Sequence, residues 1–549
     1  MTGQIPDEKP CLVQTPQGFS ISYQNKLLYS KYNPSRAICS EIENLTILPG
    51  TLFLCCSPVL PYGLKELVAK LDDKSFCLLC EFDRELDSFS RSQEEFSEIS
   101  RMQKSARLTL SELKELPSIL HLSSYRTSDG ANLLPCGSFK RIVRLDFSAG
   151  VNFHKELYDQ FAQACTSSIM TFWANRMTLV KFGRRYSQDF FKNLKLLPFT
   201  RPVESFFNSV TKPILVFGAG ESTDQGILEI KEHRDNFFIL CADTALQPLL
   251  LNGIEADGVF IEEAQTVIKK AFIGVQNHKT HLFAGLSAVP ALNRIFPENR
   301  ISFFTTLYTR ADFIENLQKK DILPPANEPF GSVGLTAVYY GLRFRKSDEI
   351  PVYIYGLDFS YSAGKTHARG SMAHTNRIIN HTRLNPIANY QAAFGPFSEK
   401  AESKDGQIFF TTRTLKNYAW LFTGYFSGVK NLFDAGKCGI KLGLIQKKPE
   451  LNKKAPVEQA EKNISFSQKD KDRINDFFKG EKNTLIELRD ILSGEKKLSP
   501  EEQEKKIREL ALPREYLYLH FPDGIHFSCE KSLLKRIRAE IDFFLKIFN

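Results

Sequence analysis

The sequence predicts an α/β protein, with a Rossmann-like parallel central sheet, a smaller N-terminal α/β lobe and a helical C-terminal domain. Short apolar runs alternate with segments of helical periodicity between Lys212 and Glu263, a pattern typical of a parallel sheet with crossover helices. A glycine turn, Gly218-Ala219-Gly220, directly follows the first of these runs. Amphipathic, charged residues from Phe466 onward predict the C-terminal helices.

The composition of this 549-residue chain is globular, with 42% hydrophobic and 25% charged residues, and the length predicts about two to four domains. The net charge of +9 suits small anionic ligands and gives no argument for a nucleic-acid partner. Eleven scattered cysteines predict a reduced, cytoplasmic setting. The N-terminus shows no signal peptide, and no uncharged apolar run reaches 18 residues, so no transmembrane segment is expected.

The N-terminal lobe is expected over residues 1–150. Residues 17–50 suggest a small β unit, and residues 51–86 repeat a strand, turn, helix and strand. The only CxxC motif, Cys77 to Cys80, lies within an apolar run and has no second pair, which favours buried strand thiols over a metal site. Residues 151–210 have a long helical pattern that ends near Pro198, and we interpret them as a connector made of a helix pair.

The central domain is expected over residues 211–446. Its strands are predicted at 214–217, 237–241, 256–263, 280–284, 300–305 and 351–355, with an aromatic helix at 414–426. Residues 447–465 lack apolar periodicity and are interpreted as a flexible linker. A helical domain is then expected over residues 466–549, as a cap or a partner-binding element.

The glycine turn has the properties of a phosphate cradle. Gly218 and Gly220 permit close backbone approach, and the helix start behind them offers free N–H groups to an anion. Ser222 is expected to cap that helix and to donate to the anion. The third glycine of a dinucleotide fingerprint is missing, so a plain tight turn remains the alternative interpretation.

Further candidates follow later strands, and ligands collect at the carboxyl ends of parallel strands. Three acidic residues there would bind a metal or sugar hydroxyls, or would merely cap strand ends: Asp243 (followed by Thr244), Glu262 and Asp358. Gly331 and Ser332 open a second helix that could face an anion.

The polar loop from Tyr361 to His374 offers cations to a phosphate or carboxylate, through Lys365 and Arg369. His367 is the candidate general base, because imidazole titrates near neutral pH. One alternative is that His367 is a surface residue without a catalytic role. Another is that a different histidine is the base, and the competing candidates are His374 and His381.

Together these motifs resemble the motility-associated factor (Maf) family, whose central domain is also called hydroxymethylpterin-diphosphokinase (MptE)-like. The resemblance rests on GAGESTD, CADTALQPLLLNGIEADGVF, GSVGLTAVYYGL and YGLDFSYSAGKTHARG in this order. LLYSKYNPSRA and NLFDAGKCGIKLG are similar to that family's flanking segments, so the likeness spans roughly residues 20–446. The chain departs from the family where Glu221 and Thr223 replace the usual Pro and Leu, and where Glu262 replaces the usual Asp.

The resemblance implies a cytoplasmic glycosyltransferase that moves a nonulosonic acid from its CMP-activated form to Ser or Thr hydroxyls of flagellin. The expected reaction uses the CMP-sugar as a substrate and requires no cofactor. Mg²⁺ remains possible. By that similarity Gly218, Gly220 and Ser222 would cradle the nucleotide phosphate, Ser332 and Thr336 would lie near the donor, and Asp358 with the loop after it would face the reacting sugar. Together with the argument above for a general base, the predicted catalytic residues are His367 and Asp358. The predicted donor-binding residues are Gly218, Gly220, Ser222, Asp243, Thr244, Glu262, Ser332, Thr336, Tyr361, Lys365 and Thr366. The alternatives are an ATP-dependent pterin diphosphokinase that needs Mg²⁺ on the carboxylates, and a non-catalytic flagellin-binding protein.

Overall fold

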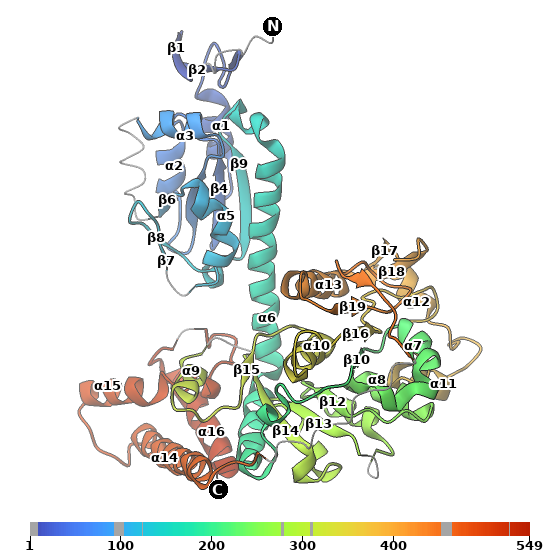
Figure 1. Ribbon diagram of the computed structural model, residues 1–549. Helices are drawn as coiled ribbons and strands as arrows, with labels where there is room; N and C mark the ends of the chain where they lie inside the picture. The colour runs from blue at the N-terminus through green and yellow to red at the C-terminus, as the bar shows by residue number, and fades with distance from the viewer. Residues whose placement is uncertain are drawn as a thin grey trace. The chain divides into compact units, whose positions relative to one another are not determined.

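The computed structural model describes residues 9–92, 104–122, 125–275, 279–307, 311–451, 464–525 and 527–548. The chain divides into two compact units, Met1–Lys181 and Phe182–Asn549. As predicted, both units combine parallel strands with helices, and further helices follow at the C-terminus (Figure 1). In the described residues no helix is both long and apolar enough to cross a membrane.

The first unit is built on a four-stranded sheet in the order β6-β5-β4-β9, all of it parallel. Buried apolar residues on both faces of β4 and β5 pack against the surrounding helices, as expected for a parallel sheet. The strands are β1 (Cys11–Thr15), β2 (Gly18–Tyr23), β3 (Lys26–Leu27), β4 (Thr51–Cys56), β5 (Phe76–Cys80), β6 (Ser105–Arg107), β7 (Tyr125–Arg126), β8 (Asn132–Leu133) and β9 (Arg141–Asp146). The helices are α1 (Arg36–Asn44), α2 (Leu64–Ala69), α3 (Arg84–Arg91) and α5 (Leu110–Ile119). Cys77 and Cys80 are buried thiols of β5.

One helix, α6 (Lys155–Leu196), replaces the helix pair expected in the connector. Its 42 residues contain no proline, and Pro198 comes two residues after its end, so no proline interrupts the helical hydrogen bonds. The start of α6 contributes Tyr158 and Phe161 to the core of the first unit. Near its end, Phe191 is fully buried within the second unit.

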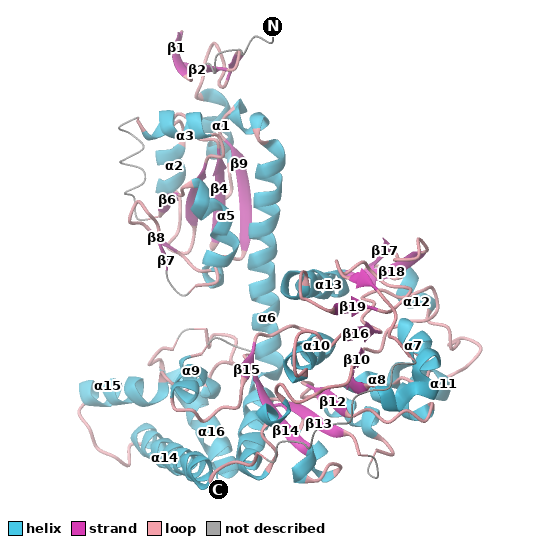
Figure 2. Ribbon diagram, viewed as in Figure 1, coloured by secondary structure: helices cyan, strands magenta, loops and turns pink. Residues whose placement is uncertain are grey.

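The second unit contains a nine-stranded sheet in the order β15-β14-β13-β12-β11-β10-β16-β19-β20 (Figure 2). Every strand pair in it is parallel. The strands are β10 (Ile214–Phe217), β11 (Phe238–Ala242), β12 (Gly258–Ile261), β13 (His281–Gly285), β14 (Ile301–Thr306), β15 (Ala326–Asn327), β16 (Val352–Tyr355), β19 (Leu432–Asp434) and β20 (Ile445–Gln446). The chain adds strands on one side of β10 and then crosses to its other side with β16, so the strand order reverses between β10 and β16.

Helices cover both faces of this sheet. On one face α10 (Val333–Phe344) packs over β10, β11, β12 and β16, and with α13 (Arg413–Phe426) it closes an aromatic-rich core. On the other face α7 (Ser222–Ile230) packs against β16, and α8 (Asp243–Leu251) packs against β11 and β12. Shorter elements complete the unit: α9 (Asp312–Lys319), α11 (Met372–Ile379), α12 (Tyr390–Phe394) and the hairpin of β17 (Ser398–Glu402) and β18 (Ile408–Thr412).

The C-terminal part is helical, as predicted, and consists of α14 (Gln468–Ser493), α15 (Pro500–Ala511) and α16 (Lys531–Phe548). Its aromatic side chains surround Phe191 of α6, which contacts Phe478, Tyr516, Phe544 and Phe548. Much of the segment interpreted as a linker, residues 452–463, lies outside the described residues.

Candidate active site

A cavity of about 570 Å³ lies where the strand order of the sheet reverses. Its floor is formed by the turns that end β10 and β16, Gly218–Gly220 and Gly356–Asp358. The start of α8, the start of α10, the loop 360–367 and α13 complete the wall. The reversal point of an open parallel sheet is the usual place for a ligand in this architecture. We call this cavity the switch-point pocket.

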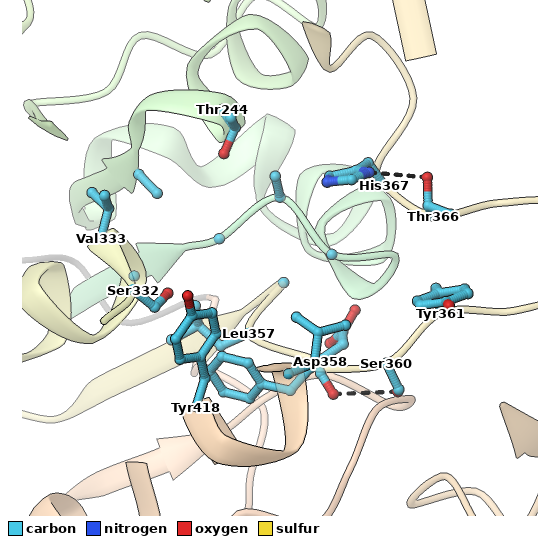
Figure 3. A pocket seen from close by; sticks show the side chains of 18 of the residues that line it. Thr244, Ser332, Val333, Leu357, Asp358, Ser360, Tyr361, Thr366, His367 and Tyr418 are labelled. Atoms are coloured by element: carbon cyan, nitrogen blue, oxygen red, sulfur yellow. Dashed lines mark hydrogen bonds between the residues drawn. The ribbon is translucent and has the colours of Figure 1, made fainter. Parts of the chain in front are cut away.

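The pocket brings together most of the residues that the sequence singled out (Figure 3). Nine of them line it: Gly218, Gly220, Asp243, Thr244, Ser332, Asp358, Tyr361, Thr366 and His367. Four do not line it: Ser222, Glu262, Thr336 and Lys365. These four instead support residues of the wall or the surrounding loop.

The two glycines allow the turns after β10 and β16 to touch. A side chain at Gly218 would meet the carbonyl oxygen of Gly356 at 2.3 Å, and one at Gly220 would meet Asp358 Oδ2 at 2.5 Å. The N–H of Gly220 donates to the carbonyl of Gly356 at 2.9 Å. The glycines therefore serve the junction between two strands, in addition to lining the pocket.

The carboxylate of Asp358 occupies the start of α7, where the sequence suggested a phosphate. Its Oδ2 accepts from the backbone N–H of Ser222 at 2.8 Å, and its Oδ1 accepts from the Ser222 hydroxyl at 2.5 Å. That hydroxyl also accepts from the N–H of Gly356 at 2.7 Å. Burial raises the pKa of Asp358 to about 6, although the nearby Lys404 and the bonds from Ser222 oppose the shift.

Two expectations for Ser222 are therefore corrected. Glu221 holds the cap position of α7, and its side chain makes no capping bond, so Ser222 is not the cap. The Ser222 hydroxyl is buried and already used twice within the protein, because it joins α7 to the end of β16. It has no remaining proton to donate to a phosphate.

Glu221, which stands where the family usually has Pro, follows the glycine turn, and a carboxylate there would repel a phosphate if it faced the pocket. The carboxylate lies 3.6 Å from Lys365 Nζ and accepts weakly from the N–H of Ser362, at 3.4 Å. Lys365 also forms an ion pair with Asp224 at 2.8 Å. Glu221 does not line the switch-point pocket, so its charge is directed toward a lysine and away from the cavity.

Glu262 and Thr336 act together behind the pocket wall. Glu262 accepts from the hydroxyl of Thr336 at 2.7 Å and from that of Thr306. Burial raises the pKa of Glu262, while these two hydroxyl bonds oppose the shift. The pair ties the end of β12 to the first turn of α10.

Asp243 is the buried carboxyl that faces the cavity at the start of α8. Its Oδ1 accepts from the N–H of Thr244 at 2.6 Å. Burial raises its pKa to about 7, and the charges of Glu263 and Glu262 add to the effect. A carboxyl with this pKa exchanges protons near neutral pH, so Asp243 joins His367 as a candidate proton acceptor.

His367 lines the pocket and lies across it from Ser332 and Tyr418 in this view (Figure 3). Its Nδ1 is 3.0 Å from the hydroxyl oxygen of Thr366. When Nδ1 donates that bond, Nε2 is the basic nitrogen. His367 is exposed to solvent, but partial desolvation by the neighbouring protein still lowers its pKa, so the neutral base is the prevailing form at neutral pH. The loop around it bends at Gly364 and Gly370, which both have positive φ.

The start of α10 offers the open anion site of the pocket. Gly331 has φ of +74°, which turns the chain into the helix. In the described part of the chain no acceptor is found for the N–H groups of Ser332, Val333 and Gly334, and the cap residue Ser332 makes no side-chain capping bond. The first N–H groups of a 12-residue helix attract an anion.

Sequence reasoning missed several residues of the wall. Tyr418 projects its hydroxyl toward the cavity from α13, and no described group bonds that hydroxyl (Figure 3). Asn389 and Thr412 also line the pocket. Thr412 is the last residue of β18, a strand that the sequence did not predict, and Tyr418 and Asn389 come from segments without a strand-end or glycine-turn signal. Only the folded arrangement reveals these three residues. No group of three or more His, Cys, Asp and Glu residues within the described ranges is placed to hold a metal ion.

Comparisons with known proteins agree with this architecture. A family model described as "6-hydroxymethylpterin diphosphokinase MptE-like" matches residues 187–364, which include the turns after β10 and β16. An uncharacterized protein of Treponema pallidum (strain Nichols) is 31% identical over 574 residues, covering 100% of this chain and 96% of that protein. The chain belongs to one family with this treponemal protein and has an MptE-like domain at its centre.

The MptE-like domain and the rest of the chain share their fold with a solved structure of a Maf glycosyltransferase from Magnetospirillum magneticum AMB-1. The TM-score is 0.52 at 13% sequence identity, and the likeness covers 98% of this chain and 91% of that chain. The expected relation to the MptE-like domain and to the Maf fold is thus confirmed.

Proposed function

We propose that the chain is a glycosyltransferase that moves a nonulosonic acid from a CMP-activated donor to Ser or Thr hydroxyls of flagellin. The observation that carries the proposal is the switch-point pocket with the open helix start of α10 in its wall. The fold likeness to a Maf glycosyltransferase supports the choice of reaction.

The phosphate of the donor would lie at the start of α10. The N–H groups of Val333 and Gly334 and the hydroxyl of Ser332 would donate to its oxygens. The start of α7 is not available, because Asp358 fills it. The residues that line the pocket include no Lys or Arg, so helix N–H groups and hydroxyls must provide the stabilisation of the leaving phosphate.

The reaction exchanges one bond at the anomeric carbon for another. The acceptor hydroxyl oxygen forms a bond to that carbon while the bond from the carbon to the phosphate oxygen of CMP breaks. CMP departs with the bonding electron pair as a phosphate monoester. The hydroxyl proton goes to Nε2 of His367, which the bond between Nδ1 and Thr366 orients.

The test uses the purified full-length protein, a CMP-nonulosonic acid and flagellin. Release of CMP together with a flagellin mass increase of one nonulosonic acid per site supports the proposal. Flagellin of unchanged mass in strains with and without the gene contradicts it, and a wild-type protein that does not bind CMP contradicts it independently.

The family description favours a second candidate, an ATP-dependent diphosphokinase acting on a pterin. That reaction commonly uses Mg²⁺ held by carboxylates, and Asp243 and Asp358 line the pocket. The bonds that Ser222 makes to both oxygens of Asp358 compete with such a role. Formation of a pterin diphosphate from ATP and 6-hydroxymethylpterin, dependent on Mg²⁺, would identify this activity.

A further inference from the structure

A second cavity, of about 310 Å³, adjoins the switch-point pocket. The two share Thr366, His367 and Asn389 as lining residues. The second cavity is built from the loop 364–369, from α11 and from residues 387–389. His367 therefore stands at the boundary of two compartments, and a substrate that reacts beside it can extend into both. We call the second cavity the basic pocket.

The two compartments differ in charge. The switch-point pocket is lined by the carboxyls Asp243 and Asp358, and neither Lys nor Arg lines it. The basic pocket is lined by Lys365, Arg369 and Arg377, and neither Asp nor Glu lines it. A substrate that spans both finds cations for a second anionic group in the basic pocket, whereas its phosphate in the switch-point pocket would be held by the helix start of α10.

The cations of the basic pocket are not equally compensated. Lys365 is neutralised by Asp224 and Glu221 of the α7 region. Arg377 donates to two neutral acceptors, the carbonyl of Pro386 at 3.1 Å and Oδ1 of Asn389 at 2.6 Å, and so keeps its positive charge. For the guanidinium of Arg369, the described residues provide no acceptor and no ion-pair partner.

The backbone around Arg369 is nevertheless fixed. The N–H of Arg369 donates to Asp224 Oδ1 at 3.0 Å, and the N–H of Ala368 donates to the carbonyl of Ala219 at 2.9 Å. These bonds attach the loop to the glycine turn of the switch-point pocket. His374 Nδ1 accepts from the N–H of Gly370 at 3.2 Å, so the neutral ring carries its proton on Nε2 as a further donor.

We propose that the basic pocket binds the carboxylate of an acidic donor sugar, with Arg369 as its principal ligand. The inference rests on the proposed glycosyltransferase function. A nonulosonic acid carries its carboxylate on the anomeric carbon, the atom that reacts beside His367. When the phosphate lies at the start of α10 and the anomeric carbon lies beside His367, the carboxylate on that carbon is directed toward Arg369. A planar guanidinium pairs with a carboxylate through two parallel hydrogen bonds, which a neutral sugar cannot accept in that way.

The test compares three ligands by calorimetric titration of the full-length protein: CMP, CMP-N-acetylneuraminate and the methyl ester of the latter. The wild-type protein should bind the free acid about 10-fold more tightly than the ester, the order expected for one charge-assisted contact. Arg369→Ala should remove this difference and leave the affinity for CMP unchanged. Arg369→Lys should restore only part of it, because an ammonium keeps the charge without the paired geometry.

Arg383→Ala is the matched control, since Arg383 is an exposed arginine of the same segment that lines neither pocket. Equal affinities for acid and ester in the wild type, or an Arg369→Ala variant that keeps the difference, would overturn the carboxylate assignment. An effect of Arg369→Ala confined to KM for the acceptor would also overturn it and place an acceptor carboxylate in the pocket. Failure of the wild type to bind CMP refutes the proposed function instead, so the two failures are distinguishable.

Discussion

His367 combines the properties that a general base needs at the residue scale. It lines both pockets, its pKa is lowered by the surrounding protein, and Thr366 holds its Nδ1. His367→Ala should lower turnover by about 10²-fold or more, with the affinity for CMP nearly unchanged. Steady-state kinetics and CMP titration measure the two effects.

The control is His381→Ala, because His381 is exposed and lines neither pocket. Near-normal turnover of His367→Ala would place the base elsewhere. Asp243 is then the first residue to test, because it faces the switch-point pocket, and His374 follows, because it lines only the basic pocket.

The Ser222 hydroxyl matters for stability, because it links Asp358 to the backbone of Gly356. Ser222→Ala leaves the N–H of Gly356 without this acceptor and removes one bond to a buried carboxylate. The free energy of unfolding should fall by about 1–3 kcal/mol, the usual cost of an unsatisfied buried group. Urea denaturation measures it. A variant with unchanged stability and weakened CMP binding would instead support the original assignment of Ser222 to the phosphate.

The raised pKa of Asp243 makes stability depend on pH. The pKa is about 7 in the folded protein against an ordinary value of 3.8, so the folded state holds the proton more tightly than the unfolded state. The resulting stabilisation is complete below about pH 4 and is lost as the pH rises through about 7. Asp243→Asn should therefore show a smaller loss of unfolding free energy between pH 4 and pH 8 than the wild type. Asp235→Asn, at an exposed position, is the control. If the free energy of unfolding changes with pH equally in all three proteins, the raised pKa of Asp243 is refuted.

At the scale of elements, the start of α10 is predicted to bind the donor phosphate through its first N–H groups. Val333 is the first helical residue and Ser332 before it is extended, so a proline fits at position 333. Val333→Pro should keep the helix and weaken CMP binding about 10-fold, because it removes one charge-assisted donor. Val333→Ala is the matched control, since it shortens the same side chain and keeps the N–H. Equal CMP affinities for both variants would exclude this N–H from the site.

For the whole molecule, the sequence predicts first proteolytic cleavage between Gln446 and Ser465. The described chain on either side of residues 452–463 is held in place. The carbonyl of Leu451 accepts from Asn236 at 2.7 Å, and α14 begins with a capping box of Ser467 and Asp470. Mass spectrometry of early fragments should locate the cut. Earlier cleavage within residues 212–360 would contradict the predicted division of the chain.

Local patterns were sufficient to predict the strands that end at the pocket. The apolar run 214–217 coincides with β10, and 351–355 differs from β16 by one residue, because a glycine turn ends each run. The bond between Ser222 and Asp358 was not predictable, because it joins residues 136 positions apart in a single sequence. Tyr418 was missed because its aromatic helix looks the same whether the ring packs in a core or lines a cavity. The prediction of a helix pair in residues 151–210 was wrong, because polar and aromatic residues alone do not end a helix.

The junction of the turns after β10 and β16 also bears on how the protein folds. β10 meets β11 after a short excursion of the chain, whereas Ser222 meets Asp358 only when a loop of 136 residues closes. Contacts that close long loops form late, because their entropic cost precedes their gain. We therefore predict that the proposed nucleotide site forms only after the folding transition state. A bound nucleotide would consequently slow unfolding and leave the refolding rate unchanged, so its protection of the protein would be kinetic as well as thermodynamic.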